Sequence, residues 1–408
     1  MQVIVVGAGP AGAALAFLLA RRGIGVVLIE RHTDFAREFR GEGLMPSGVS
    51  ALEQMGLGGK LDGLPQARLA VLEVFRGDRR LARLPFAGDR LRITGPRIVS
   101  QPAMLEMLVA EAARFPSFSL ERGSVARDLV RDASDRIVGL EVEGASGARE
   151  LRADLVIAAD GRSSVLRRRA GVREVRFRQA FDIVWCKVPL PDILAHPPTA
   201  RAYLGRGHAA LAFASYDERL QIGWIIDKGS FGELRSRGVD AWLEELGTHV
   251  SADLREHLAR SRGRVSHPFV LDVVCDRVGS WTVPGLLLIG DAAHAMSPVG
   301  AQGINLALRD AIVAANELVP VLTRSAAALP DDVDAAARRV QAAREPEVVE
   351  IQRLQQVPPP ILFGASWWSR FLIDHALPLL LRTRIAQAAA LPTLRRLTTG
   401  VSEVRLAV

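Results

Sequence analysis

The first 30 residues constrain the fold more than any other part of this sequence. An apolar run over residues 2–6 leads directly into Gly7-x-Gly9-x-x-Gly12. A second run of β-forming residues, 26–29, ends at Glu30. A strand, a glycine-rich turn, a helix and a second strand ending in an acid predict a dinucleotide-binding βαβ unit at this spacing.

Each residue type in this unit has a physical reason. Gly7 allows a tight turn, Gly9 lets backbone N–H groups approach a pyrophosphate, and Gly12 lets the helix pack closely on the strand. The helix, which we expect over residues 13–22, directs partial positive charge at the phosphates. Glu30 is placed to accept hydrogen bonds from a ribose diol.

Residues 1–20 carry no charge, so hydropathy alone would also suggest a signal peptide or a membrane span. A signal peptide needs a basic segment before its apolar core, which is missing here. Three glycines and a proline within six residues would break a spanning helix. We therefore retain the nucleotide site.

Composition limits the remaining classes. With 408 residues, 49% of them hydrophobic, the chain can bury one large core or two joined ones. Its two cysteines, Cys186 and Cys275, predict neither a disulfide framework nor a metal site, and favour a reducing cytoplasm. The net charge of +7 is spread along the chain without interleaved aromatic residues, so we predict anionic cofactors and substrates and no nucleic acid.

A second nucleotide-type turn follows the apolar run 155–158. This run brings Asp160 and Gly161 to its carboxyl end, and Ser163 is the expected cap of a helix that reaches Ala170. Ligands in open α/β sheets lie beyond the carboxyl ends of the strands. We expect this turn and the first one to share a crevice.

A third strand–turn–helix segment covers residues 286–322. Gly290 and Asp291 end the strand, and a loop rich in Gly and Pro precedes a long helix. The free N–H groups at the start of that helix would stabilise an anion formed on an electron-accepting ring. Asp291 can hold a polyol hydroxyl. We interpret His294 as a locally packed side chain, because no partner acid is evident.

Together these three segments resemble the motifs of the single-component FAD-dependent aromatic hydroxylases, the family of p-hydroxybenzoate hydroxylase. The similarity extends from residue 1 to about 322. The cofactor residues expected from the motifs and the resemblance are Gly7, Gly9, Pro10, Ala11, Gly12, Glu30, Arg31, Arg40, Gln101, Val125, Asp160, Gly161, Gly290, Asp291, Pro298, Gly300, Gly303, Ile304 and Asn305. No catalytic residue is assigned.

The resemblance implies roles for several of these residues. Glu30 would bind the adenosine ribose, and Asp291 the ribityl chain. Gly303 and Ile304 would border the isoalloxazine ring, and Asp160 would serve both FAD and a passing NAD(P)H. Family members that ionise a phenol use tyrosine, and this chain offers two, at positions 203 and 216.

The activity implied is that of an FAD-dependent monooxygenase that consumes NAD(P)H and O2. It would hydroxylate or epoxidise an apolar, aromatic or polyketide-like small molecule through a flavin C4a-hydroperoxide. The sequence has no second Gly-x-Gly-x-x-Gly for a nicotinamide domain, so NAD(P)H would bind transiently. A homodimer is left open.

Strand alternation and hairpin signals mark a substrate-side sheet. Gly77-Asp78 and residues 216–218 are the expected turns. We predict an α/β fold with a Rossmann-like FAD-binding domain (1–67, 99–178 and 279–325), an inserted, mainly antiparallel β-sheet substrate domain (68–98 and 179–278) and C-terminal helices (326–408). The candidate pocket residues are Trp185, Tyr203, His208, Phe213, Trp224 and Phe269.

The C-terminal region reads as helical, with a stop or bend at the three prolines 358–360. Its later apolar helices are too short and too charged to span a membrane. They can cover the substrate cavity, form a dimer face or touch a membrane surface, and we favour the first.

Two other activities remain as alternatives. A flavin-dependent reductase of the geranylgeranyl-reductase type shares the scaffold, although residues 223–228 match that group's Tyr-x-Trp-x-Phe-Pro stretch only loosely, and the Trp-x-Trp-x-Ile-Pro signature of flavin-dependent halogenases is absent. A non-catalytic flavin-binding or lipid-binding protein is the other alternative. Oxygen uptake that depends on NAD(P)H and substrate separates the monooxygenase from all of these.

Overall fold

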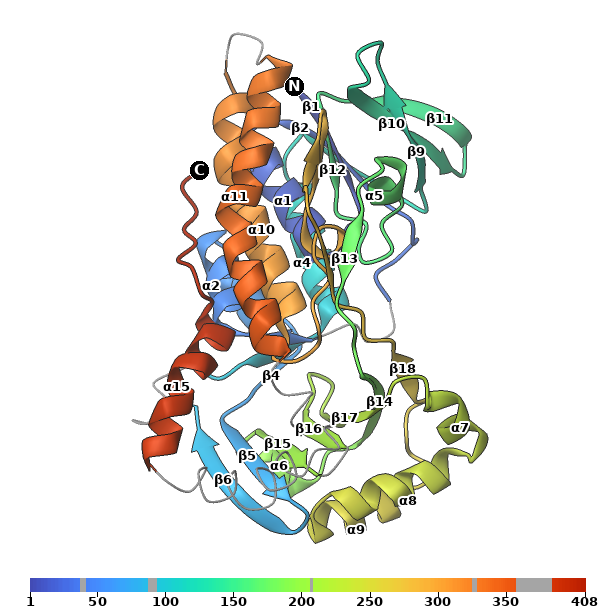
Figure 1. Cartoon of the computed structure of the whole chain (residues 1–408), viewed down its shortest axis with the longest axis vertical. Helices are drawn as coiled ribbons and strands as arrows, with labels where there is room; N and C mark the ends of the chain where they lie inside the picture. Colours follow the sequence, from blue (N-terminus) through green and yellow to red (C-terminus); the bar gives the residue numbers. More distant parts are fainter. Residues whose placement is uncertain (37–41, 87–93, 206–207, 325–328, 357–383) are drawn as a thin grey trace.

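The computed structural model describes residues 1–36, 42–86, 94–205, 208–324, 329–356 and 384–408, with backbone alone for 384–391. The predicted cofactor residue Arg40 and the three prolines 358–360 lie outside these ranges. Two sheets dominate the molecule, one in each half of Figure 1.

The first sheet is parallel except at one edge and contains the predicted βαβ unit. Its order is β20-β21-β12-β1-β2-β8, and only the edge strand β20 is antiparallel. The strands are β1 (Gln2–Val6), β2 (Gly25–Glu30), β8 (Phe118–Arg122), β12 (Leu155–Ala158), β20 (Thr282–Val283) and β21 (Leu286–Leu288). The central strands are continuous apolar runs because both faces of a parallel sheet are covered. The α/β prediction is confirmed.

Helices cover one face of this sheet, where α1 packs against α4 and α10, and α10 against α11 (Figure 1). They are α1 (Pro10–Arg21), α4 (Gln101–Ala112), α10 (Gln302–Leu322) and α11 (Pro330–Gln355). Helix α1 begins three residues earlier than we predicted, because the fixed φ of proline suits a first helical position. A small antiparallel sheet contacts β12, formed by β9 (Val125–Arg131), β10 (Ile137–Gly144) and β11 (Gly147–Arg152).

The second sheet has the order β18-β14-β17-β16-β15-β5-β6. Its strands are β5 (Val71–Arg76), β6 (Arg79–Pro85), β14 (Phe181–Pro189), β15 (Thr199–Leu204), β16 (Ala209–Ala214), β17 (Arg219–Asp227) and β18 (Phe269–Leu271). The two predicted hairpins are present, as β5–β6 and β16–β17. All its pairs are antiparallel except β15–β5.

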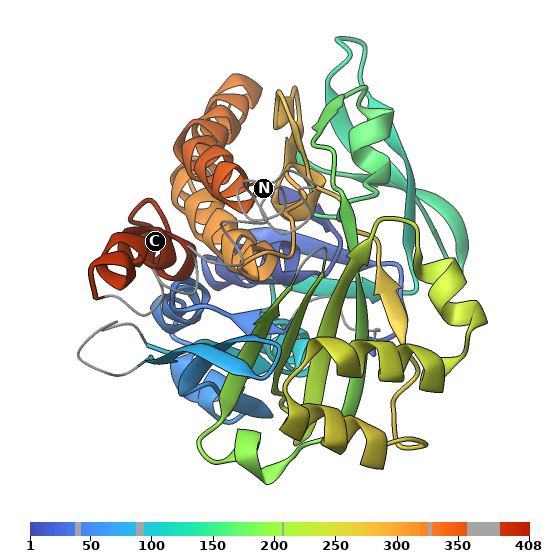
Figure 2. The same ribbon diagram turned by 60° about the horizontal axis from the view of Figure 1, so that its bottom comes forward.

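Side chains alternate between the two faces of this second sheet. One face, the helix face, packs Val184 and Cys186 against α8 (Val239–His249) and α9 (Ala252–Arg260), which lie across it in Figure 2. The other, the loop face, packs Trp185 and Phe213 against Val299 of the loop before α10. The loop face therefore looks toward the parallel sheet.

Short elements complete the described chain. They are β3 (Gly43–Leu44), α2 (Pro46–Gln54), α3 (Gly58–Asp62), β4 (Gln66–Arg68), β7 (Arg97–Val99), α5 (Val165–Arg169), β13 (Glu174–Arg176), α6 (Asp192–Ala195), α7 (Phe231–Ser236), β19 (Asp276–Val278), the 3₁₀ turn η1 (Gly290–Ala292) and α15 (Arg384–Thr399). Among the residues that the structure describes, no helix combines the length and apolarity needed to cross a membrane.

Candidate cofactor and substrate site

The first glycine turn tolerates no side chain at two of its three glycines. Gly7 has φ +100°, and a Cβ there would lie 2.4 Å from the carbonyl oxygen of Ala159. A Cβ at Gly12 would lie 2.0 Å from the carbonyl oxygen of Gly7. A Cβ at Gly9, by contrast, would meet no atom of the described residues within 4 Å. The turn is thus closed against β12 and open in front of Gly9.

The open side of the turn is also the start of α1. Gly9 is the N-cap, Pro10 the first helical residue, and no described side chain caps the helix. The first N–H groups of α1, including that of Ala11, are therefore available to an anion. A dinucleotide pyrophosphate fits this arrangement of free donors and free space.

Glu30 ends β2 beside this turn and is almost fully buried. Its carboxylate accepts hydrogen bonds from the backbone N–H groups of Ala8 and His32, each at 3.0 Å. Carboxylate oxygens have further lone pairs, so the same group can accept from a ribose diol. Val125 lies next to Ser124, whose N–H donates to the Glu30 carbonyl, while Arg31 is exposed.

Asp160 both caps a helix and keeps one oxygen free. Its Oδ2 accepts from the N–H groups of Val165 and Leu166 at 2.7 and 3.2 Å. Its Oδ1 is buried and has no hydrogen-bond partner among the described residues. Burial raises the pKa of this carboxyl above its ordinary value. A free buried acceptor beside the first turn suits a ligand that donates a hydrogen bond.

The predicted cap of α5 is wrong by one residue. Ser164, not Ser163, is the N-cap, and its Oγ accepts from the N–H of Arg167 at 2.9 Å. Gly161 turns with φ +83°, and the helix starts only at Val165. The turn between Asp160 and the helix is therefore one residue longer than we predicted.

Asp310 of α10 anchors the loop that follows β21, residues 290–301. Asp310 Oδ2 accepts from the N–H of Gly290 at 3.1 Å and lies 2.7 Å from Nε2 of His294. His294 therefore has the partner acid that we could not see in the sequence. Burial alone would raise the pKa of Asp310, but His294 and Arg344 hold it below its ordinary value.

At the other end of this loop, α10 begins with an open N-terminus. Ala301 precedes it in the left-handed conformation (φ 53°), and no described side chain caps it. A Cβ at Gly303 would lie 3.9 Å from Asp291 Oδ1, so the predicted ribityl ligand and the helix start are neighbours. Asp291 is also 3.9 Å from the Arg162 guanidinium. Free N–H groups beside a half-buried carboxylate suit a polyol chain that leads to an electron-accepting ring.

The remaining predicted residues of this region play different parts. The side-chain amide of Asn305 hydrogen-bonds the backbone around β3: it accepts from the N–H of Met45 and donates to the carbonyl of Gly43. Asn305 therefore holds the start of α10 against β3. Ile304 is buried in the main core, Pro298 and Gly300 (φ +74°) shape the loop, and Gln101 is the partly exposed first residue of α4.

The six predicted pocket residues divide between the two faces of the second sheet. Trp185 and Phe213 are in edge contact at 6.1 Å on the loop face, and Phe269 packs with them. The other three lie on the helix face or at its edge. Tyr203 hydrogen-bonds Ser251, Trp224 stacks on Trp242, and His208 lies on the ring of His249. The structure does not bring these three to the loop face.

Our reading of the sequence overlooked polar side chains on the loop face. Lys187 lies two residues beyond Trp185, and Ser215 two beyond Phe213, so strand alternation was the signal. Lys187 Nζ donates to Ser215 Oγ at 3.0 Å and to Asp217 Oδ2 at 2.9 Å. It also lies 3.8 Å from Oε1 of Glu42, the residue before β3. We refer to Glu42, Lys187, Ser215 and Asp217 as the Glu42 cluster.

Two open helix N-termini lie at the carboxyl ends of one parallel sheet, as the sequence predicted for a dinucleotide, and the chain is an FAD-dependent monooxygenase. The family model described as "FAD binding domain" matches residues 1–345, and the chain belongs to that family.

Curated relatives and solved structures agree with this assignment. The chain is 32% identical over 413 residues to 6-methylpretetramide 4-monooxygenase of Streptomyces rimosus. This alignment covers 99% of this chain and 94% of that protein. It is 28% identical to digeranylgeranylglycerophospholipid reductase 1 of Methanopyrus kandleri, over 75% of this chain and 77% of that protein. The crystal structure of p-nitrophenol 4-monooxygenase from Pseudomonas putida has the same fold, with a TM-score of 0.79 at 19% identity and 98% of each chain covered.

Proposed function

We propose that this enzyme hydroxylates or epoxidises an apolar, aromatic or polyketide-like small molecule, with NAD(P)H as a transient co-substrate and O2 as oxidant. The observation that carries the proposal is the loop face, where Trp185, Phe213 and Phe269 pack with Val299 of the loop that precedes α10. The similarity to a monooxygenase of 6-methylpretetramide over nearly the whole chain supports the same substrate class.

FAD, when bound, would accept electrons from a nicotinamide and pass them to O2. This chain supplies binding and orientation. The start of α1 and Glu30 would hold the ADP half, and Asp291 would hold the ribityl chain. The open N-terminus of α10 would stabilise negative charge on the ring. The aromatic loop face excludes water, which would otherwise discharge the activated oxygen unproductively.

We further propose that the two sheets belong to the domains named above, with boundaries at about residues 67, 98, 178 and 278. The two cysteines are free and buried, which supports a reducing cytoplasm. Whether the enzyme is a homodimer is decided by light scattering of the purified holoenzyme.

The reductase alternative has one specific observation in its favour, the relative in Methanopyrus kandleri. A reductase would transfer electrons from the flavin to an alkene without consuming O2. Oxygen consumption distinguishes the two activities directly.

The test uses purified holoenzyme with alizarin, a dihydroxyanthraquinone, as the probe. We expect denaturation to release FAD, and alizarin to accelerate NAD(P)H oxidation with matching O2 uptake and an oxygenated product. Release of FMN would contradict the cofactor assignment. NAD(P)H oxidation that alizarin does not accelerate would contradict the proposed substrate class.

A further inference from the structure

The Glu42 cluster joins the cofactor half of the molecule to the substrate-side sheet. The backbone of Glu42 belongs to the cofactor half, since its carbonyl accepts from the N–H of Val99. The next residue, Gly43, lies against the loop before α10, where its Cβ would come within 3.0 Å of the Ala301 Cβ. The backbone at Glu42 is thus close to the part of the loop that borders the predicted ring site.

The carboxyl group itself faces the second sheet. Only 6% of Glu42 is exposed, and its Oε2 accepts from Ser215 Oγ at 3.4 Å. A chain of polar contacts runs from Glu42 through Ser215 to Lys187 and on to Asp217. About a third of the Asp217 side chain is exposed. The buried carboxyl group therefore has a hydrogen-bonded route to solvent.

This route is continuous with the aromatic surface. In the sheet register Lys187 lies opposite Gln221, and Gln221 lies opposite Phe213 on its other side. Directly opposed residues of antiparallel strands share a face, with Cβ atoms roughly 5 Å apart. Trp185 lies two residues before Lys187 on the same face. A molecule on the loop face would meet Gln221 and Lys187 at the polar end of an aromatic wall.

Gln221 carries an unmet hydrogen-bonding requirement. Only 1% of the residue is exposed, and its Oε1 is buried without a partner among the described residues. A buried amide oxygen left unpaired is destabilising, so such groups in folded proteins are normally satisfied by a partner. A hydroxyl group on a bound molecule would satisfy it.

The charges around Glu42 suit exchange of a proton near neutral pH. Burial is the largest influence, and it raises the pKa of Glu42 to about 7 although Lys187 opposes the shift. Asp217 raises it further. Tyr216, whose ring centre lies 4.3 Å from Lys187 Nζ, is a further titratable group beside the cluster.

We propose that Glu42 accepts the proton of an acidic hydroxyl group, phenolic or enolic, on the substrate, while Gln221 hydrogen-bonds the same molecule. The substrate O–H bond breaks, its electron pair stays on the substrate oxygen, and a new O–H bond forms on the Glu42 carboxylate. The negative charge thus moves to the substrate beside the Lys187 ammonium group. The proton later leaves along the contacts of the cluster: Lys187 passes a proton to Asp217 as it receives one from Ser215, which in turn receives that of Glu42.

This assignment rests on the proposed function and gives it a specific chemistry. An oxyanion donates electron density into its ring, and an electron-rich ring reacts faster with an electrophilic oxygen. Tyr203 cannot serve this purpose, because it is buried on the helix face. Glu42 would then do in this chain what tyrosine does in the relatives that ionise a phenol.

The first experiment needs no substrate. Infrared difference spectra of the holoenzyme are recorded between pH 5 and pH 9 for the wild type, Glu42→Gln and Glu73→Gln. Glu73 is the matched control, a carboxyl group with 6% exposure that pairs with Arg201 on the helix face of the same sheet. We expect a protonated-carboxyl band that disappears with a midpoint near 7 in the wild type and Glu73→Gln, and is missing from Glu42→Gln.

The second experiment uses alizarin, whose visible band moves to longer wavelength when its hydroxyl group ionises. At pH 7.5 we expect the wild type and Glu73→Gln to bind it as the anion and to gain a protonated-carboxyl infrared band on binding, because Glu42 keeps the proton. Glu42→Gln should gain no such band, and Gln221→Leu should bind alizarin at least tenfold more weakly while keeping the carboxyl titration.

A wild type that lacks the carboxyl titration, or that binds alizarin only in its neutral form, overturns this assignment. So does a Glu42→Gln variant that gains the protonated-carboxyl band when alizarin binds. FAD content and flavin reduction by NAD(P)H are measured on the same samples. If they are normal, the failure concerns Glu42 alone, whereas their absence would contradict the proposed function.

Discussion

Gly9 is the glycine at which a side chain would test the cofactor site without straining the turn. Its φ of −72° is available to any residue, and a Cβ there meets no atom within 4 Å in the part of the chain that the structure describes. In Gly9→Val the side chain would occupy the space in front of α1, so we expect the protein to fold and lose FAD at least tenfold more readily. Gly232→Val, at a glycine whose Cβ also meets nothing, is the control. Equilibrium dialysis of FAD measures both, and equal retention would contradict the placement of the pyrophosphate.

Asp291 gives a second prediction for a single residue. Loss of a charge-assisted hydrogen bond to a ribityl hydroxyl would cost roughly 1.5–3 kcal/mol, so Asp291→Ala should weaken FAD binding about ten- to a hundredfold. Asp272→Ala, which removes an exposed carboxylate paired with Lys228, should leave the affinity unchanged. Flavin fluorescence titration of the apoprotein compares the two, and equal affinities would remove Asp291 from the site.

At this scale the sequence predicted backbone requirements better than side-chain partners. Gly7 and Gly12 were identifiable because a turn that presses on β12 excludes any Cβ. The partner of His294 was not, because Asp310 is sixteen residues further on, inside a helix. Glu42 and Lys187 meet only when two sheets from distant parts of the chain come together.

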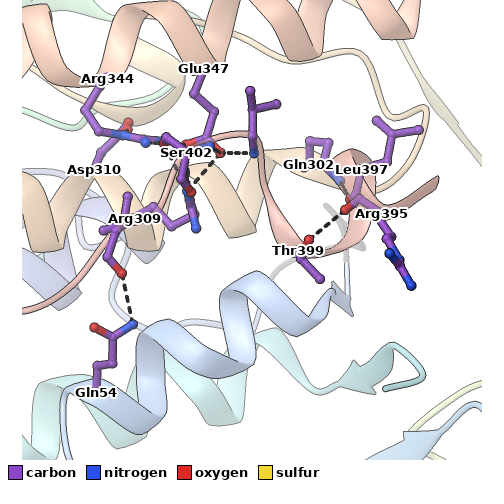
Figure 3. Close-up of polar contacts among 12 residues, drawn as sticks. Gln54, Gln302, Arg309, Asp310, Arg344, Glu347, Arg395, Leu397, Thr399 and Ser402 are labelled. Carbon is purple, nitrogen blue, oxygen red and sulfur yellow. Dashed lines mark hydrogen bonds and ion pairs between the residues drawn. The ribbon is translucent and has the colours of Figure 1, made fainter. Parts of the chain in front are cut away.

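At the scale of elements, a buried ionic network fastens α10 to α11 and to the residues after α15. Arg344 of α11 contacts Asp310 of α10 at 2.7 Å and also contacts Glu347. Glu347 binds Arg309 and accepts from the N–H of Val401 at 2.7 Å. Figure 3 shows these groups converging from the two helices and the C-terminal segment. Asp310 also accepts a hydrogen bond from Gly290, so the network connects the loop of residues 290–301 to the C-terminal segment.

Removing one member of this network leaves charges that are buried without a partner. We expect Arg344→Met to lower the free energy of unfolding by about 3–5 kcal/mol. Arg339→Met, on the same helix as Arg344, removes a half-exposed pair with Glu317 of α10 and should cost about 1 kcal/mol or less. Urea denaturation followed by circular dichroism gives both values, and similar losses would mean that the network adds nothing to stability.

The same network predicts how stability depends on pH. Burial opposes the shift, but the arginines hold the pKa of Glu347 below its ordinary 4.5, and His294 and Arg344 hold that of Asp310 below its ordinary 3.8. Carboxyl groups with a pKa lowered by folding stabilise fully above the ordinary value, and this contribution is lost as the pH falls through the folded value. We expect stability to decrease below about pH 4, and less steeply in Arg344→Met. Parallel slopes in the two proteins would contradict the assignment.

The elements themselves were largely predictable, but the assignment of side chains to faces was not. Turn signals gave both hairpins of the second sheet, and apolar runs gave the parallel strands. Trp185 and Trp224 looked equivalent in the sequence because both faces of this sheet are buried, the helix face by α8 and α9 and the loop face by residues such as Val299. Alternation then shows which residues share a face without showing what covers it.

For the whole molecule, the fold follows from three strand–turn–helix segments whose strands lie side by side in one sheet. The parallel sheet and the family were predicted correctly, because each glycine turn fixes both a strand end and a helix start. The contribution of α15 had no local signal. Its place depends on contacts with residues almost a hundred positions earlier, such as the hydrogen bond from the Gln302 amide to the carbonyl of Leu397.

Helix α15 gives a prediction about coupling between cofactor reduction and product formation. Leu394 packs against the buried apolar residues of the loop face, as Val299 does, so α15 helps to keep water from the space between loop and sheet. In Leu394→Ser a hydroxyl replaces apolar contact at this point. We expect FAD content to be unchanged, and the share of oxidised NAD(P)H recovered as H2O2 to rise severalfold, because admitted water discharges the activated oxygen.

Arg395→Ser is the control for this prediction, since it changes the neighbouring exposed position of the same helix. NAD(P)H consumed, H2O2 formed and oxygenated alizarin are measured in one reaction mixture for each variant. A Leu394→Ser enzyme as well coupled as Arg395→Ser would show that α15 does not seal the site. A Leu394→Ser enzyme that also loses FAD would place the effect in folding. If the yield of oxygenated alizarin per NAD(P)H falls while FAD content stays unchanged, the apolar contact between α15 and the loop face is what excludes water from the reaction.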